Sequence, residues 1–140
     1  KILTSENFED YTFKINNDLN DLKYLQLSFL SKIPLNIKIK EVRFLDKEKK
    51  EIEKIIFERE KHLKFLSPSK NIKEIVDNYL LVHKNDETGE NFYYEERLNP
   101  YIDKIKMDTK FLIVKTAVQN NFKPRFKDWI FFLASEKSNN

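Results

Sequence analysis

The residues that could perform chemistry in this chain are two histidines and a few carboxylates. His62 and His83 are the only histidines, and the chain contains no cysteine. A transition-metal site built on them would need at least two further ligands from Asp or Glu. We therefore expect solvated or hydrogen-bonded histidines, no metal site and no cofactor.

Paired carboxylates could serve general acid–base catalysis if their surroundings separate their pKa values. Acidic residues gather around Glu6 and Asp10 and again at Glu95 and Glu96. Adjacent side chains of a strand point to opposite faces, so Glu95 and Glu96 cannot share one site if FYYEER is extended. A small carboxylate enzyme is the disfavoured alternative. A deep pocket lined by two of Glu6, Asp10, Glu95 and Asp128 would revive it.

Nucleophiles and phosphate-binding loops have no motif in this sequence. There is no cysteine and no G-x-S-x-G segment. Phosphate-cradling loops require several glycines, whereas Gly89, in a polar turn, is the only one. We predict no catalytic or cofactor-binding residue, and hence no enzyme.

Aromatic side chains cluster in two short segments. The first holds Phe92, Tyr93 and Tyr94, and the second holds Phe126, Trp129, Phe131 and Phe132. Consecutive residues of a strand alternate between its faces, so at least one ring of the first segment must face away from the core. A core on both faces is the simpler account. The alternative is an exposed patch that docks a partner, with Tyr93, Trp129 and Phe131 as its first candidates.

The composition is that of one globular domain covering residues 1–140. Apolar residues make up 40% and charged residues 35%, with a net charge of +3. Lys and Glu are finely mixed, as in KEKKEIEK, whereas nucleic-acid binders usually segregate their positive charge. No apolar run approaches the roughly 20 residues of a membrane span. We expect neither a nucleic-acid partner nor a membrane span.

Alternation of apolar and polar residues predicts strands. It runs through YTFKI (11–15), LQLSF (25–29) and LNIKI (35–39). The phase then slips at Val42 and Phe44, and a β-bulge around Lys40–Glu41 would restore the register. Both faces of FLIVKTAV (111–118) are apolar until Lys115, as in a central strand.

Residues 42–52 admit two structures. A helix over 46–66 would gather Ile52, Ile55 and Ile56 on one side, but its apolar stripe fails at Arg59. A hairpin would end one strand at Phe44 and turn at Asp46, whose side chain can accept hydrogen bonds from the backbone beyond it. The hairpin is favoured.

Helical spacing appears farther along the chain. Ile72, Ile75, Val76, Tyr79 and Leu80 follow the i, i+3, i+4, i+7, i+8 pattern, after a capping Ser67 and Pro68. This spacing predicts a helix over about 68–81, and a second helix begins at Pro100. The predicted fold is mainly β, a two-layer Ig-like β-sandwich of about seven strands with one added helix at 68–81. The alternative is an α+β sheet covered by helices over 46–66 and 68–81.

The segment LKYLQLSFLSKIPLNIKIKEVRFLDKEKKEI (22–52) resembles the core of FxLYD-type and related Ig-like sandwich domains of bacterial envelope lipoproteins. In that group an aromatic residue precedes an acidic turn of the form D-K-x-G-K-x-I. Those places are occupied here by Phe44, Asp46, Lys47, Lys50 and Ile52, with Lys49 where the pattern has Gly. The resemblance implies an extracytoplasmic, non-catalytic module that engages other proteins, and it transfers no functional residue.

We therefore expect a binding or assembly module of a bacterial cell envelope, periplasmic or on the surface, that engages a protein partner. Its contact would be an exposed strand edge or the aromatic patch. The chain begins at Lys1 without a methionine, and a lipid anchor upstream would fit this expectation. The alternative is a cytoplasmic partner-blocking protein of the toxin-neutralising or anti-defence type.

Overall fold

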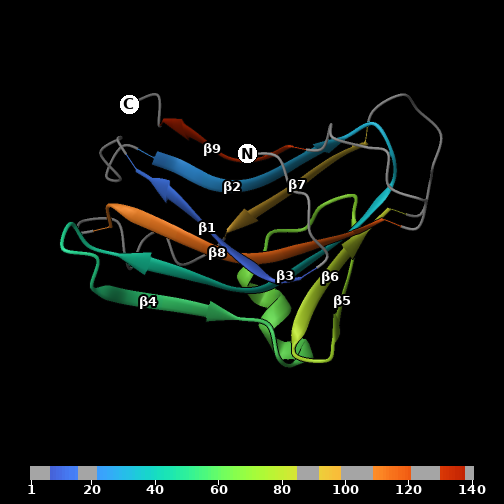
Figure 1. The fold of residues 1–140 in the computed structure, drawn as a ribbon, viewed down its shortest axis with the longest axis horizontal. Helices are drawn as coiled ribbons and strands as arrows, with labels where there is room; N and C mark the ends of the chain where they lie inside the picture. The colour runs from blue at the N-terminus through green and yellow to red at the C-terminus, as the bar shows by residue number, and fades with distance from the viewer. Residues whose placement is uncertain (1–6, 16–21, 85–91, 99–108, 121–129, 138–140) are drawn as a thin grey trace.

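A computed structural model describes residues 7–15, 22–84, 92–98, 109–120 and 130–137. This part of the chain is mainly β, and its strands form two antiparallel sheets that pack face to face as a sandwich (Figure 1). The strands are β1 (Glu9–Lys14), β2 (Leu22–Ser31), β3 (Leu35–Leu45), β4 (Glu51–Ile56), β5 (Ile72–Val76), β6 (Tyr79–His83), β7 (Phe92–Leu98), β8 (Phe111–Asn120) and β9 (Ile130–Lys137). A short 3-10 helix, η2, spans Glu60–Phe65. The predicted β-sandwich is confirmed.

The two sheets differ in size. The larger one has the order β1-β8-β3-β6-β5, with β4 also paired to β3, and the smaller one has the order β7-β2-β9. β8 lies between β1 and β3, as its two apolar faces predicted. β7 and β9 are the edges of the smaller sheet.

The alternating segments form the predicted strands and supply the core. Leu25, Leu27 and Phe29 of β2 are buried, and so are Ile37 and Ile39 of β3. Along β3 and β8 the pairing passes from Ile39↔Thr116 to Glu41↔Lys115, which leaves Lys40 unopposed. The predicted bulge at Lys40–Glu41 is confirmed. It brings both Ile39 and Val42 to the core side.

An aromatic cluster joins the two sheets. Phe131 of β9 is fully buried and stacks on its cross-strand neighbour Phe29 at 4.2 Å between ring centroids. From the facing sheet, Phe13 and Tyr11 of β1 meet the same ring edge-on at 5.0 and 5.8 Å. Aromatic pairs favour these stacked and edge-to-face arrangements. Phe131 therefore belongs to the core.

Residues 42–56 form the hairpin, not the helix. β3 and β4 pair antiparallel across a turn in which the Asp46 carboxylate accepts the backbone N–H groups of Glu48 and Lys50, both at 2.9 Å. The turn needs a left-handed residue, and Lys49 takes it with φ 64°. The stability of this hairpin therefore rests on Asp46, because Lys49 has the side chain that this conformation disfavours.

The helix predicted over 68–81 is wrong, because these residues form the antiparallel hairpin of β5 and β6. Its two central turn residues, Asp77 and Asn78, have φ of 47° and 71°. Asp and Asn tolerate this conformation, and two consecutive positive φ values characterise the tight hairpin turn that suits the twist of strands. The two strands raise the count from the expected seven to nine.

Two smaller predictions, the turn at Gly89 and the helix beginning at Pro100, lie outside the described residues. Within the described ranges, no helix is long and apolar enough to cross a membrane.

Replacing Lys49 by Gly is expected to raise the free energy of unfolding by about 0.5–1 kcal/mol, because glycine adopts positive φ without the clash of a Cβ atom. Equilibrium unfolding in urea measures the difference.

The matched control is Lys49→Ala, which also removes the ammonium that lies 5.4 Å from the Phe111 ring centroid. Alanine keeps the backbone penalty, so this variant should gain nothing. Equal gains from both variants would show that the side chain, and not the backbone, limits stability here.

Candidate functional site

β7 presents two different rows of side chains. Phe92, Tyr94, Glu96 and Leu98 are buried, whereas Tyr93, Glu95 and Arg97 are exposed. Glu95 and Glu96 thus lie on opposite faces of the strand, as the sequence predicted. The inward row holds the sheets together, and the outward row faces a groove.

The inward Tyr94 links the two sheets through its hydroxyl group. The hydroxyl accepts the backbone N–H of Leu35 at 2.8 Å and donates to the carbonyl of the same residue at 3.1 Å. Leu35 opens β3 in the larger sheet, while Tyr94 is fully buried in the smaller one. Burial of a tyrosine costs little when its hydroxyl is satisfied in this way.

The inward Glu96 is a carboxylate with only 1% of its side chain exposed. Lys73 of β5 lies 3.2 Å from it, Ser69 donates to it at 2.6 Å, and the Asn71 amide donates at 3.2 Å. A buried charge is tolerated only when it is paired and hydrogen-bonded. Glu96 therefore fixes the segment between η2 and β5 against the inner side of β7.

Among the described residues, this segment covers only the end of the β7 edge. Ser67 donates its N–H to the Arg97 carbonyl at 3.1 Å, but the Ser67 carbonyl accepts the Lys73 ammonium at 3.1 Å instead of continuing the ladder. In an antiparallel sheet, alternate residues direct both backbone groups to the same side. Tyr93 and Glu95, in phase with Arg97, therefore point their N–H and C=O groups at the free edge.

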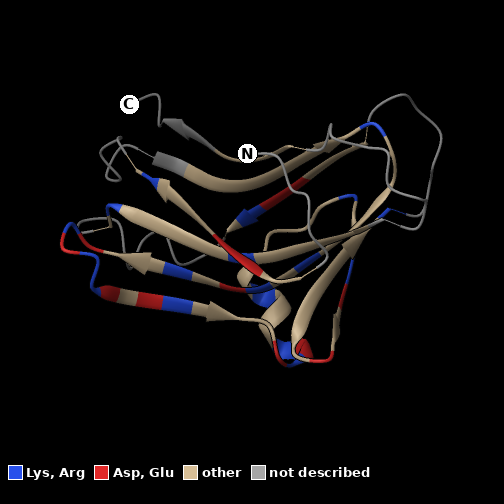
Figure 2. Cartoon of the chain, viewed as in Figure 1, with Lys and Arg blue, Asp and Glu red and all other residues tan. Residues whose placement is uncertain are grey.

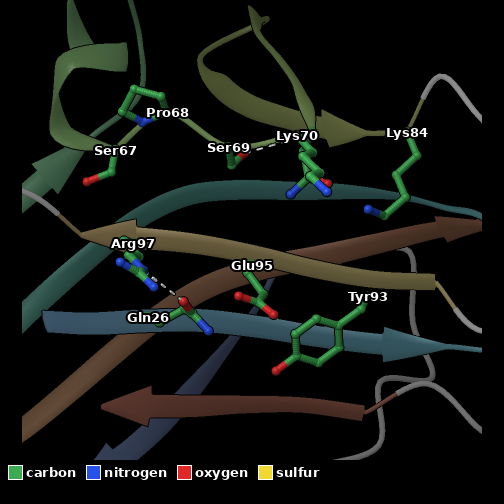
Figure 3. A pocket seen from close by; sticks show the side chains of 10 residues that line it. Gln26, Ser67, Pro68, Ser69, Lys70, Lys84, Tyr93, Glu95 and Arg97 are labelled. Carbon is green, nitrogen blue, oxygen red and sulfur yellow. Dashed lines mark hydrogen bonds between the residues drawn. The ribbon is translucent and has the colours of Figure 1, made fainter. Parts of the chain in front are cut away.

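A groove of about 490 Å³ follows this edge (Figure 3). It is lined by Gln26, Ser67, Pro68, Ser69, Lys70, Asn71, Lys84, Tyr93, Glu95 and Arg97. Figure 3 shows Glu95 and Tyr93 projecting from β7, with Lys70 and Lys84 on the opposite wall. Its volume lies in the range of ligand-binding clefts.

The groove carries more positive than negative charge. Lys70, Lys84 and Arg97 face one carboxylate, Glu95. In the described part of the chain, none of these three cations forms an ion pair. Arg97 is held by a hydrogen bond to Gln26 at 3.3 Å and by the Tyr24 ring, 4.1 Å away. Elsewhere Lys, Arg, Asp and Glu interleave along the strands (Figure 2).

Beside the groove lies an apolar surface that we call the outer patch: Tyr93, Leu30, Ile130 and Phe132. The first three form one row across β7, β2 and β9. Tyr93 is 37% and Ile130 41% exposed, and Phe132 lies 6.2 Å from the Tyr93 ring. Tyr93 belongs to both the groove and the outer patch.

Of the three residues predicted to bind a partner, Tyr93 is exposed and lines the groove. Phe131 is fully buried, so it is not part of an exposed surface; its neighbours Ile130 and Phe132 take the outward positions. Trp129 lies outside the described residues. Alternation along β9 implies that Phe131 and its two neighbours lie on opposite faces of the strand. It does not indicate which of the two faces is turned toward the core.

The histidines serve local structure. His62 accepts the backbone N–H groups of Glu58 and Arg59 on Nδ1 at 3.0 and 3.1 Å, which orders the start of η2. His83 pairs with Ile72 in the β5–β6 ladder. No group of three or more metal-ligating side chains occurs within the described ranges.

A second charged cluster lies on the outer face of the larger sheet. Glu41 contacts Lys54 at 2.9 Å, Lys115 at 3.6 Å and Arg43 at 3.8 Å. Burial raises the pKa of Glu41, but the hydrogen bond and charge of Lys54, with the other two cations, outweigh it and lower the pKa. Asp10 is paired with Arg43 at 3.3 Å in the same cluster. Their charges are paired within the cluster, although the buried Arg43 Nε has no hydrogen-bond partner among the described residues.

Two of the candidate catalytic carboxylates are described, and they lie apart: Glu95 lines the groove and Asp10 lies in the other cluster. Glu6 and Asp128 lie outside the described residues.

Comparison with protein-family models, with curated proteins and with solved structures finds no match for this chain. The groove and the outer patch are the features of the described residues that bear on function.

Replacing Lys73 by Met is expected to lower the free energy of unfolding by about 3–5 kcal/mol, because it leaves the Glu96 carboxylate buried without its counter-charge. Chemical denaturation at neutral pH measures the loss.

The double variant Lys73→Met/Glu96→Gln removes both charges and retains an oxygen acceptor for Ser69 and Asn71. It should recover more than half of the loss. A cost below about 1 kcal/mol for Lys73→Met, the size of an exposed ion pair, would contradict the role given to Glu96.

Proposed function

We propose that this chain is a non-catalytic binding module that engages an extended segment of a protein partner along the free edge of β7. The supporting observation is that Tyr93 and Glu95, whose backbone groups strand alternation directs at the edge, both line a groove of about 490 Å³. The outer patch begins at the same Tyr93, so backbone pairing and apolar contact are available side by side.

The edge supplies the affinity in this proposal. Unpaired N–H and C=O groups of an edge strand are a template for another strand, and strand addition needs no special side chains on the receiving protein. The 66–71 segment covers β7 only at its end, where Leu66 bridges Leu98 and Ser67 bonds to Arg97. Tyr93 and Glu95 have no such cover among the described residues.

The outer patch supplies the apolar contact. Tyr and other large apolar residues dominate the energetics of interfaces because they bury much area with little loss of conformational freedom. Two of the three large apolar residues that are exposed in the described ranges, Tyr93 and Ile130, lie in this one row. A partner strand at β7 would extend the sheet beside it.

For the compartment, we propose a bacterial cell envelope, periplasmic or on the surface. The support is the resemblance of residues 22–52 to envelope sandwich domains and the absence of cysteine. A cytoplasmic partner-blocking protein would use the same edge, and the location of the chain in its source cells decides between the two.

Replacing Glu95 by Pro is expected to weaken strand addition at least about ten-fold, because it removes the N–H directed at the free edge while the bonds from β7 to β2 stay intact. Peptides of ten residues, selected from a random displayed library on the wild-type chain, are titrated against the variant.

Glu95→Ala removes the same side chain and keeps the N–H group, so it should bind the selected peptides almost as the wild type does. Thermal unfolding checks that both variants are folded. If the peptides bind Glu95→Pro as tightly as Glu95→Ala, pairing at this edge is wrong.

Replacing Tyr93 by Ala is expected to weaken binding of the same peptides by about ten-fold, the effect of losing an aromatic interface residue. Ile52→Ala is the matched control, because Ile52 on β4 is exposed to a similar extent, 39% against 37%. An equal loss in both variants would mean that the outer patch is not the contact.

A further inference from the structure

We infer that the segment received at β7 is acidic, and this inference rests on the proposed function. Three features of the groove carry it: cations that have no ion-pair partner among the described residues, a buried acceptor in its wall, and the mixed donor and acceptor pattern of its edge. The occupant is thereby an extended peptide segment with carboxylates spaced at alternate residues.

The cations favour negative charge on the occupant. Lys70 and Lys84 lie on the wall opposite β7, and Arg97 closes one end (Figure 3). Gln26 accepts a hydrogen bond from the Nε group of Arg97, and no described residue binds its forked Nη groups, which match a carboxylate in geometry. Glu95 is the single opposing charge, and it disfavours a partner that is acidic at the position beside it.

The wall contains a buried acceptor without a donor. Asn71 is only 9% exposed and lines the groove, and its Oδ1 has no hydrogen-bond partner among the described residues. Its amide nitrogen is committed to Glu96 at 3.2 Å, so turning the amide would place oxygen against the carboxylate. Unmet buried acceptors cost free energy. This oxygen is enclosed in the wall, so an added segment would reach it only if the Asn71 side chain turned outward.

The edge distinguishes a peptide from a nucleic acid. Tyr93 and Glu95 each offer one N–H and one C=O, and a peptide backbone supplies the complement of both. A phosphate backbone supplies acceptors alone, so it would leave the two edge carbonyls unpaired while it meets the Glu95 charge. Acidic peptide is therefore the favoured occupant.

Four defined probes test this inference: ten-residue peptides of alternating Thr with Glu, Gln or Lys, and a ten-residue oligo-thymidine. Binding is measured by fluorescence anisotropy at low salt, and the site by the amide shifts of Tyr93 and Glu95 in NMR spectra. The Thr–Glu peptide is expected to bind about five-fold more tightly than the Thr–Gln peptide, the effect of two exposed charge contacts.

Neutralising the wall, as Lys70→Gln/Lys84→Gln, should abolish this preference. Lys47→Gln/Lys61→Gln removes two exposed lysines elsewhere and should leave it unchanged. Equal binding of the Thr–Glu and Thr–Gln peptides at Tyr93 and Glu95 would overturn the acidic preference and leave the proposed function standing. Peptides that shift neither amide would overturn both, and tighter binding of oligo-thymidine at these amides would replace peptide by nucleic acid.

Discussion

The buried carboxylate of Glu96 constrains how the segment between η2 and β5 lies against β7. Glu96 sits on the inner face of an edge strand, where it must be neutralised and hydrogen-bonded. Ser69 and Asn71 come from the segment between η2 and β5, and Lys73 comes from β5 itself. The Lys73 ammonium also binds the Ser67 carbonyl that would have continued the ladder. The same contacts that satisfy the charge thus hold the segment beside β7, with backbone pairing only at Leu66 and Ser67. The groove is the space that remains.

The larger part of the fold could be predicted from alternation because most strands here have one apolar face. In β2 and β3 the period of two is strong, and the slip of phase beyond Ile39 predicted the bulge around Lys40–Glu41, where the structure has it. Such patterns report burial directly. They also predicted the separation of Glu95 from Glu96, since opposite faces follow from adjacency in any strand.

The wrong predictions arise where the same local spacing fits two structures. Ile72, Ile75, Val76 and Leu80 have the spacing of a helical stripe, but they also flank the two-residue turn of Asp77 and Asn78. Both turn residues adopt positive φ, and this turn favours the hairpin over the helix. For the candidate site, the sequence identified the aromatic segments but did not indicate which of their side chains face the core. Placement of Phe131 in the core depends on Phe29 and β1, which are distant in sequence. The groove itself depends on tertiary contacts of Glu96.

The unopposed Lys40 has a consequence for how the larger sheet tolerates change. On one side of β3, residues 37–39 pair with β6 and residues 41–45 pair with β4, so the bulge lies where β3 passes from one neighbouring strand to the other. The pairing of β4 with β3 and the pairing of β6 with β3 therefore have separate registers, one on each side of Lys40. Residues can therefore be gained or lost in β4 without displacing the side chains of β6, and the reverse also holds.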